Sequence, residues 1–325
     1  MIQRLVGSEM CIRDSPSMFS GLENLLALYG YSLQVYADFS GYTDIAIGIA
    51  MIMGFYLPKN FNSPYKADNC GNFWKRWHIS LSTWLKDYLY IPMGGNRRGS
   101  LFSVIALSFI VLFVFLISGS WVLLFLILSL IFLVQLLGEF IPSFKGWYIT
   151  NVNIMLTMLL GGLWHGASWN FVLWGGLNGL GIVIYKIWRK FSPWGNKSKW
   201  WNRAWGILIT FNFVSFTRIW FRSGSTNSWE DMDGGHNILS EWFTANEMLY
   251  QLMFDFRWGL ISDVVGGYYE VLLVILTGFI IHFIPEKIKN YYRNYFANLH
   301  VGFQILTSLL VVFLSLIHIS EPTRR

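Results

Sequence analysis

The stretch LFSVIALSFIVLFVFLISGSWVLLFLILSLIFLVQLL, residues 101–137, decides the fold class. As a single helix these residues would reach about 55 Å, whereas the hydrocarbon core of a bilayer is about 30 Å thick. Ser118, Gly119 and Ser120 interrupt the apolar run near its middle and supply turn residues. We therefore predict a hairpin of two membrane-crossing helices, Leu101–Ile117 and Trp121–Leu137, which returns the chain to the side of the membrane that it left.

The composition of the whole chain agrees with a membrane protein. Of its 325 residues, 54% are hydrophobic, 18% aromatic and only 13% charged, against about 25% charged residues in a soluble domain. A disordered chain, a disulfide scaffold and a soluble enzyme do not fit these values. We predict an all-α, polytopic transmembrane protein, with further spans at Leu25–Phe55, Val152–Leu163, Trp169–Trp188, Ala204–Phe221 and Val264–Phe283 and a last one that begins near Val301.

The two ends of the chain do not look native. Val6–Arg13 reads VGSEMCIR and Leu316–Thr323 reads LIHISEPT, and opposite strands of one short DNA can encode both. That DNA resembles a sequencing-library adapter. We therefore expect residues 1–15 and 314–325 to be adapter translation, and residues 16–313 to be one membrane domain from a longer protein.

Charged residues predict the orientation of the spans. Basic residues gather in three segments, residues 59–98, 186–203 and 287–293, whereas the loop after the Ala204–Phe221 span is acidic. The positive-inside rule makes the basic segments cytoplasmic, and it also accounts for the net charge of +6. A second interpretation, less favoured, is that the positive charge attracts an anionic cytosolic donor such as a coenzyme A thioester or a phosphopantetheinyl carrier.

The first candidate functional residue is His78, in the run FWKRWHISLSTWLKDYLYIP (Phe73–Pro92). Aromatic and apolar residues recur there at helical spacing, which predicts one amphipathic helix lying at the membrane interface. His78, Ser82 and Lys86 follow at four-residue steps and would share the other face. The alternative is that the Trp residues anchor the helix at the membrane interface and that His78 has no functional role. On these features alone, the two interpretations have equal weight.

The second candidate is His165, in GGLWHGASWNF (Gly161–Phe171), between two apolar runs. A histidine at membrane depth is costly unless it is paired or lines a cavity, so it is a functional candidate by default. Apolar surroundings favour the neutral imidazole, which can act as a general base. The alternative is a structural histidine bonded to a neighbouring helix.

Other polar residues in the spans are assigned more modest roles. Asp38 and Tyr42 lie one turn apart in the first span, and so do Ser40 and Asp44. The two carboxylates could relay protons or, as we favour, pack around a polar cavity. Arg218 and Arg222 lie near a span end and are expected to extend toward the interface. The sequence carries no HExxH, CxxC or Walker-type motif, so we expect no metal site and no nucleic-acid partner.

Four motifs taken together carry a family resemblance: DFSGYTDIAIG (Asp38–Gly48), LPKNFNSPY (Leu57–Tyr65), FWKRWHISLSTWLKDYLYIPMGGNRRG (Phe73–Gly99) and MLLGGLWHGASWNFVLWG (Met158–Gly175). The chain resembles the membrane-bound O-acyltransferase family, in particular its alginate O-acetyltransferase-like branch, which is related to the D-alanyl transferases of teichoic acids. The resemblance implies interfacial or re-entrant helices around a central funnel. It also implies that His165 is the active-site histidine and His78 the second characteristic histidine.

The remaining expected substrate contacts are less specific. Asn170, or a backbone N–H near Gly166, is a candidate donor for the reaction's oxyanion, and Trp164, Ser82, Asp38 and Tyr42 are candidate substrate-binding residues. Two departures from the family pattern stand out. Ser100–Thr150 forms an insertion that we interpret as the added hairpin, and the family's N-terminal spans are missing.

The function implied by the resemblance is acyl transfer. A cytosolic thioester, acetyl-CoA or an acyl carrier, would give an acyl group, expected to be acetyl, to hydroxyls of an exported cell-envelope polysaccharide. The expected setting is the bacterial inner membrane, with the lipid bilayer and a periplasmic or surface acetyltransferase as partners and no bound cofactor. A D-alanyl or lipid acceptor is the alternative within the family. The non-enzyme alternative is a proton-coupled transporter, which is disfavoured because the sequence shows no convincing internal repeat.

Overall fold

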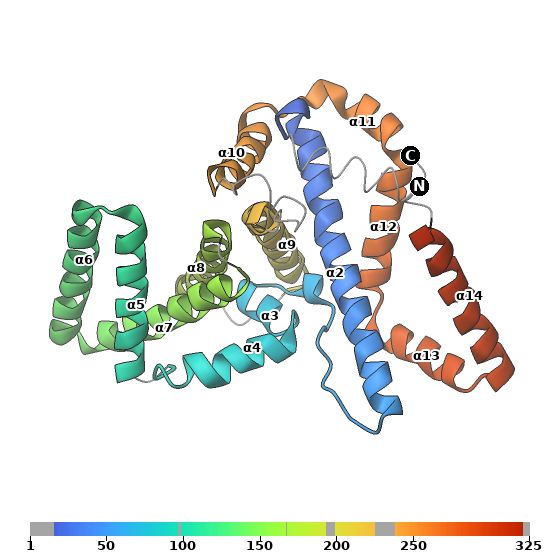
Figure 1. Ribbon diagram of the computed structural model, residues 1–325, viewed down its shortest axis with the longest axis horizontal. Helices are drawn as coiled ribbons and strands as arrows, with labels where there is room; N and C mark the ends of the chain where they lie inside the picture. The colour runs from blue at the N-terminus through green and yellow to red at the C-terminus, as the bar shows by residue number, and fades with distance from the viewer. Residues whose placement is uncertain (1–15, 97–98, 167, 193–198, 225–237, 321–325) are drawn as a thin grey trace. The chain divides into compact units, whose positions relative to one another are not determined.

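The computed structural model describes residues 16–96, 99–166, 168–192, 199–224 and 238–320 (Figure 1). These residues form helices and turns, with no strand among them, which confirms the predicted all-α class. They belong to two compact units, Ser15–Phe256 and Arg257–Arg325. The predicted adapter residues 1–15 and 321–325 lie outside the described residues.

The first unit contains every residue discussed as a candidate site. Its helices are α2 (Gly21–Ile52), α3 (Cys70–Trp74), α4 (Ile79–Leu85), a π-helical turn (Lys86–Tyr90), α5 (Leu101–Ser118), α6 (Trp121–Phe140), α7 (Pro142–Trp164), α8 (Trp169–Phe191), α9 (Trp200–Gly224) and α10 (Ile238–Phe254). Short 3₁₀ turns occur at Pro16–Met18 and Pro64–Lys66.

The predicted turn between two apolar helices is confirmed, although only α6 is by itself long and apolar enough to cross a bilayer and α5 is a shorter apolar helix. α5 ends at Ser118, the following Gly119 adopts the left-handed conformation with φ 58°, and the Ser120 side chain caps α6 by accepting a hydrogen bond from the Leu123 N–H. Glycine reaches this conformation without steric cost, so the helix can stop and reverse there. The large apolar side chains of α6 are almost all exposed, as expected for a helix that faces lipid tails.

By length and composition, three described helices can each cross a bilayer: α6, α8 and α9. In the second unit, the segment Trp258–Gly267 and α12 (Tyr269–Phe283) would count as a fourth span if taken together, but they meet at an angle of 87°. The predicted span Val264–Phe283 therefore contains a sharp bend. The bend falls at Tyr268, directly after Gly266 and Gly267, two residues with low helix propensity.

The rest of the second unit is a helical corner. α13 (Glu286–Ala297) and α14 (Val301–Ser320) are linked by Gln304, whose side-chain amide donates hydrogen bonds to the carbonyls of Phe296, Ala297 and Leu299. The Gln304 side chain thereby satisfies carbonyls left without helical partners at the end of α13.

In the first unit, α7 and α8 share the most extensive contact between two helices. A Cβ built on Gly162 of α7 would lie 2.3 Å from the carbonyl oxygen of Phe171 and 3.2 Å from the Cα of Gly175 on α8. Backbones approach this closely only where both helices lack side chains at the contact. Because α7 ends at Trp164 and α8 begins at Trp169, this contact sets how the intervening His165 is presented.

Replacing Gly162 with alanine is expected to destabilise the protein by about 1–3 kcal/mol, the usual cost of overpacking a tight contact. Gly146→Ala is the matched control, since Gly146 lies in the same helix and an added Cβ there meets nothing within 4 Å. That control should be neutral or stabilising by up to about 1 kcal/mol. Thermal unfolding in detergent measures both, and equal shifts for the two variants would contradict the argument.

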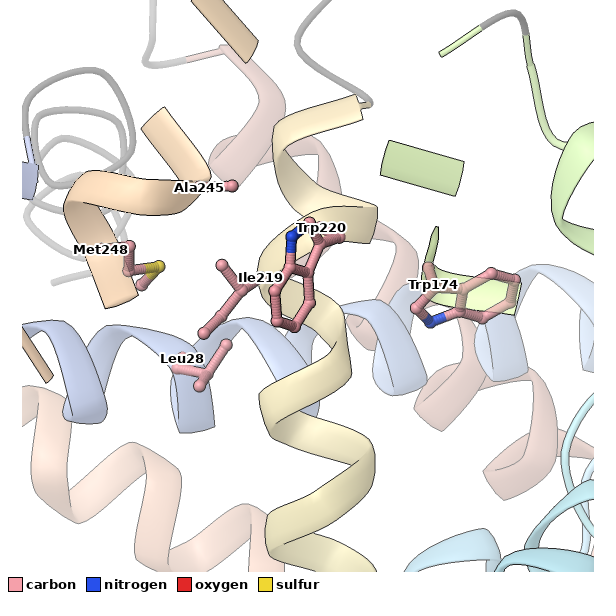
Figure 2. Close-up of a cluster of buried hydrophobic side chains, with 6 residues drawn as sticks. All are labelled: Leu28, Trp174, Ile219, Trp220, Ala245 and Met248. Atoms are coloured by element: carbon pink, nitrogen blue, oxygen red, sulfur yellow. The ribbon is translucent and has the colours of Figure 1, made fainter. Parts of the chain in front are cut away.

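The main hydrophobic cluster joins α2, α8, α9 and α10. Figure 2 shows its six buried residues, Leu28, Trp174, Ile219, Trp220, Ala245 and Met248. Trp174 is also part of the wall of the cavity described below. The same packing that holds the helices together therefore fixes one wall of the candidate site.

The single amphipathic helix predicted for Phe73–Pro92 is wrong. The chain forms α3, then a break at residues 75–78, then α4 and the π-helical turn. Phe73 and Trp77 are buried in the first unit, whereas Trp84 and Tyr88 are exposed. Helical spacing predicted one continuous face, but His78 adopts a left-handed backbone conformation with φ 45°, which ends that periodicity.

Candidate active site

His78 is held in a tight turn just before α4. The Ile79 N–H donates to the Asn60 carbonyl at 2.9 Å, and the Ser82 N–H donates to the His78 carbonyl at 2.9 Å. The His78 ring meets the ring of Phe39 on α2 edge-to-face, with centroids 4.8 Å apart. Partial burial disfavours the charged imidazole, so the pKa of His78, which lies outside the spanning helices, is lowered.

His165 lies at the break between α7 and α8. Its N–H donates to the Gly162 carbonyl at 3.0 Å and so completes the last turn of α7. The His165 ring is edge-on to Trp174 on α8 at 5.1 Å and to Phe221 on α9 at 5.3 Å. It forms no hydrogen bond to another of the described residues, so its ring nitrogens are available to a substrate.

Both histidines line one cavity, which α2, α3, α4, α8 and α9 also border. The cavity has a volume of about 70 Å³, whereas pockets for drug-sized ligands measure about 300–1,000 Å³. It therefore has room for the reacting ends of two substrates but not for a whole thioester donor. The structure thus places the two candidate histidines, which lie far apart in the sequence, in the wall of one cavity.

Arg218 of α9 lines the same cavity, contrary to the prediction that it extends to the interface. Its side chain is only 5% exposed. Its guanidinium donates to the Ser32 carbonyl of α2 at 2.9 Å and lies 4.6 Å from the centre of the Trp77 ring. These contacts offset the cost of burying the cation. Arg218 thereby brings a positive charge to the wall of the cavity that the two histidines also line.

Arg222, one turn further along α9, is also buried, with 6% exposure, and its guanidinium lies over the Tyr31 ring at 4.9 Å. It does not line the cavity. The prediction that both arginines extend outward was wrong because α9 is enclosed by α2, α8 and α10 at this level.

The other predicted substrate contacts do not line this cavity. Asn170 is 1% exposed and packs beside Gly224 at the end of α9, and the Ser82 hydroxyl donates to the Trp77 carbonyl. Trp164 is 62% exposed, and its ring adjoins that of His165. Asp38 and Tyr42 lie on an exposed part of α2. Among the described residues, no group of His, Cys, Asp or Glu side chains is arranged to hold a metal ion.

Sequence reasoning missed three residues at the site: Asn60, Arg218 and Phe221. An arginine within an apolar run is itself a signal of function, so Arg218 could have been found. Asn60 lies in the quoted run LPKNFNSPY, but nothing in its spacing from His78 indicates that the two side chains meet. Phe221 has no distinguishing signal, because aromatic residues are common throughout this chain.

The fold and the cavity define a helical membrane protein with two histidines and an arginine around a small buried site. Comparison with known proteins gives the family: residues 7–145 match the membrane-bound O-acyltransferase family. The resemblance drawn from the motifs is thereby confirmed, and this chain carries a domain of that family.

Three relatives illustrate the range of the family. The peptidoglycan O-acetyltransferase of Helicobacter pylori is 35% identical over 219 residues, which are 66% of this chain and 32% of that protein. The probable alginate O-acetylase AlgI of Pseudomonas aeruginosa is 40% identical over 159 residues, 49% of this chain and 22% of that protein. The teichoic acid D-alanyltransferase of Bacillus subtilis is 31% identical over 205 residues, 60% of this chain and 40% of that protein. The chain thus spans less than half the length of each.

Proposed function

We propose that this protein transfers an acetyl group from a thioester donor to a hydroxyl of a cell-envelope polysaccharide. The observation that carries the proposal is the shared cavity. His78, His165 and Arg218 reach it from three segments far apart in the sequence. A base and a fixed positive charge beside a small enclosed volume are what acyl transfer between a thioester and a hydroxyl requires.

The proposed reaction uses these residues as follows. The acceptor oxygen attacks the carbonyl carbon of the thioester while a ring nitrogen of His165 takes the hydroxyl proton. The negative charge that forms on the carbonyl oxygen is stabilised by the guanidinium of Arg218. The C–S bond then breaks, and the leaving thiolate takes the proton back from the His165 imidazolium. Arg218 replaces Asn170 as the proposed oxyanion donor, because Asn170 does not line the cavity.

The substrates are proposed from the charge pattern and from the relatives. Basic segments around the spans favour an anionic donor, acetyl-CoA or an acyl carrier, on the cytoplasmic side of the inner membrane. Two of the relatives above are named for O-acetylation of peptidoglycan or alginate, which supports acetyl as the group and a polysaccharide as the acceptor. A periplasmic or surface acetyltransferase is the proposed partner that completes the transfer.

D-alanyl transfer is the second candidate, because the Bacillus subtilis relative is named for it. The volume of the cavity does not distinguish an acetyl group from a D-alanyl group, so the donor must be tested directly. The identities to the acetyl-transferring relatives above, 35% and 40%, exceed the 31% of the D-alanyltransferase, and this favours acetyl.

The test is a transfer assay with the intact protein in sealed vesicles, supplied on one face with radiolabelled acetyl-CoA or D-alanyl carrier protein. We expect release of free thiol and labelling of a polysaccharide acceptor with the acetyl donor. Labelling from the D-alanyl carrier alone would establish the second candidate. Proton uptake without thiol release from either donor would contradict both and support a transporter.

A further inference from the structure

The two cavity histidines differ in how their rings are held. The His165 ring lies against four aromatic rings and forms no hydrogen bond with another of the residues that the structure describes. The His78 ring has two polar neighbours, since its Nδ1 lies 3.3 Å from the Asn60 Oδ1 and 3.3 Å from the Ser80 Oγ. Only His78 therefore has protein groups that can select which ring nitrogen carries the proton.

The hydrogen bonds around Asn60 establish that both neighbours are acceptors toward His78. The Ser80 N–H donates to the Asn60 Oδ1 at 3.0 Å, which requires the amide oxygen to lie on this side. The Ser80 hydroxyl donates its one proton to the same oxygen at 2.9 Å. The Ser80 Oγ then has only lone pairs to offer Nδ1.

We propose that Asn60, with Ser80, is a positioning residue that holds His78 as the Nδ1–H tautomer. A proton on Nδ1 satisfies both acceptors, whereas a lone pair there would face two oxygens. The Nε2 lone pair is then the free acceptor of a ring that lines the cavity. This inference rests on the proposed function for its role: the Nε2 of His78 accepts a hydrogen bond from a second hydroxyl of the polysaccharide, not the one that His165 deprotonates, and so aligns the acceptor for attack.

The turn itself supports a fixed ring. Asn60 is buried, and its backbone carbonyl accepts the Ile79 N–H while its side chain accepts the Ser80 N–H, so one residue holds the two residues that follow His78. His78 also adopts a left-handed backbone conformation, which is uncommon for a residue other than glycine, and such strain gathers at functional sites. The titratable or charged groups that share the cavity with His78 are His165 and Arg218.

The first experiment determines the tautomer of His78 by NMR and does not depend on an activity assay. In the intact protein labelled with ¹⁵N-histidine, the His78 resonances are assigned by their loss in His78→Ala. We expect a protonated Nδ1 and an unprotonated Nε2 in the wild type. Asn60→Leu should convert His78 mainly to the Nε2–H tautomer, while Asn62→Leu, the same change at an exposed asparagine two residues away, should leave it unchanged. An Nε2–H His78 in the wild type would overturn the proposal.

The second experiment follows the reaction. Asn60→Leu should lower kcat by about tenfold or more, as is seen when an active-site histidine loses the side chain that orients its ring. Asn60→Asp keeps an acceptor oxygen and folds with the same turn. Its carboxylate would favour the His78 imidazolium, so the pKa of His78 rises and the acidic limb of kcat/KM moves to higher pH. An unshifted limb in Asn60→Asp would contradict the role. If the tautomer is as expected but no thioester is consumed, the proposed function fails while the assignment of the ring stands.

Discussion

Replacing His165 with alanine is expected to lower acyl transfer by about 10²–10⁴-fold, the contribution of a general base. The ring accepts no hydrogen bond from the described residues and packs against the rings of Trp174 and Phe221. Its removal should therefore enlarge the cavity without breaking a polar network, and membrane insertion should be retained. The measurement is thiol release from acetyl-CoA in vesicles, together with the acetyl content of the exported polymer in cells.

His300→Ala is the matched control, because His300 is an exposed histidine in the second unit, far along the chain from the cavity motifs. Both variants should appear in the membrane in equal amounts, and only His165→Ala should lose activity. Undiminished acetyl content in His165→Ala would refute its role as base. Equal losses in the two variants would point to a general effect of the substitutions.

Replacing Arg218 with methionine is expected to lower kcat by about 10²–10³-fold, the loss seen when one oxyanion donor is removed. Methionine keeps most of the length of the side chain and its packing against Trp77, but it removes the charge. The Ser32 carbonyl that Arg218 binds also accepts a hydrogen bond from the Tyr65 hydroxyl at 2.5 Å. This acceptor remains satisfied in the variant, so the fold should persist.

Arg222→Met is the matched control, because it removes a buried arginine that does not line the cavity. Arg222 lies one turn further along α9, is equally buried and stacks on Tyr31 outside the cavity. Its replacement should lower the temperature of thermal unfolding but leave kcat per folded molecule unchanged. If the two arginine variants lose kcat equally, the role given to Arg218 is wrong.

Much of this protein follows from local sequence alone. The apolar run of residues 101–137 is too long for one crossing and carries its own turn at Ser118–Ser120, so the α5–α6 hairpin is determined by length, hydrophobicity and a glycine. The resemblance to the family was likewise drawn from sequence motifs without a structure, and the family match over residues 7–145 includes the motif around His78.

The site itself depends on contacts between distant segments. Helical spacing cannot show that the turn at His78 adopts a left-handed backbone held by Asn60, since that bond joins residues 18 positions apart. The direction in which Arg218 points depends on which helices surround α9, and its partner Ser32 is 186 positions away. Periodicity and composition act over a few turns of helix. The assembly of two imidazoles and a guanidinium around one cavity was decided only when α2, α8 and α9 packed together, because burial and pairing of the cation depend on all three helices at once.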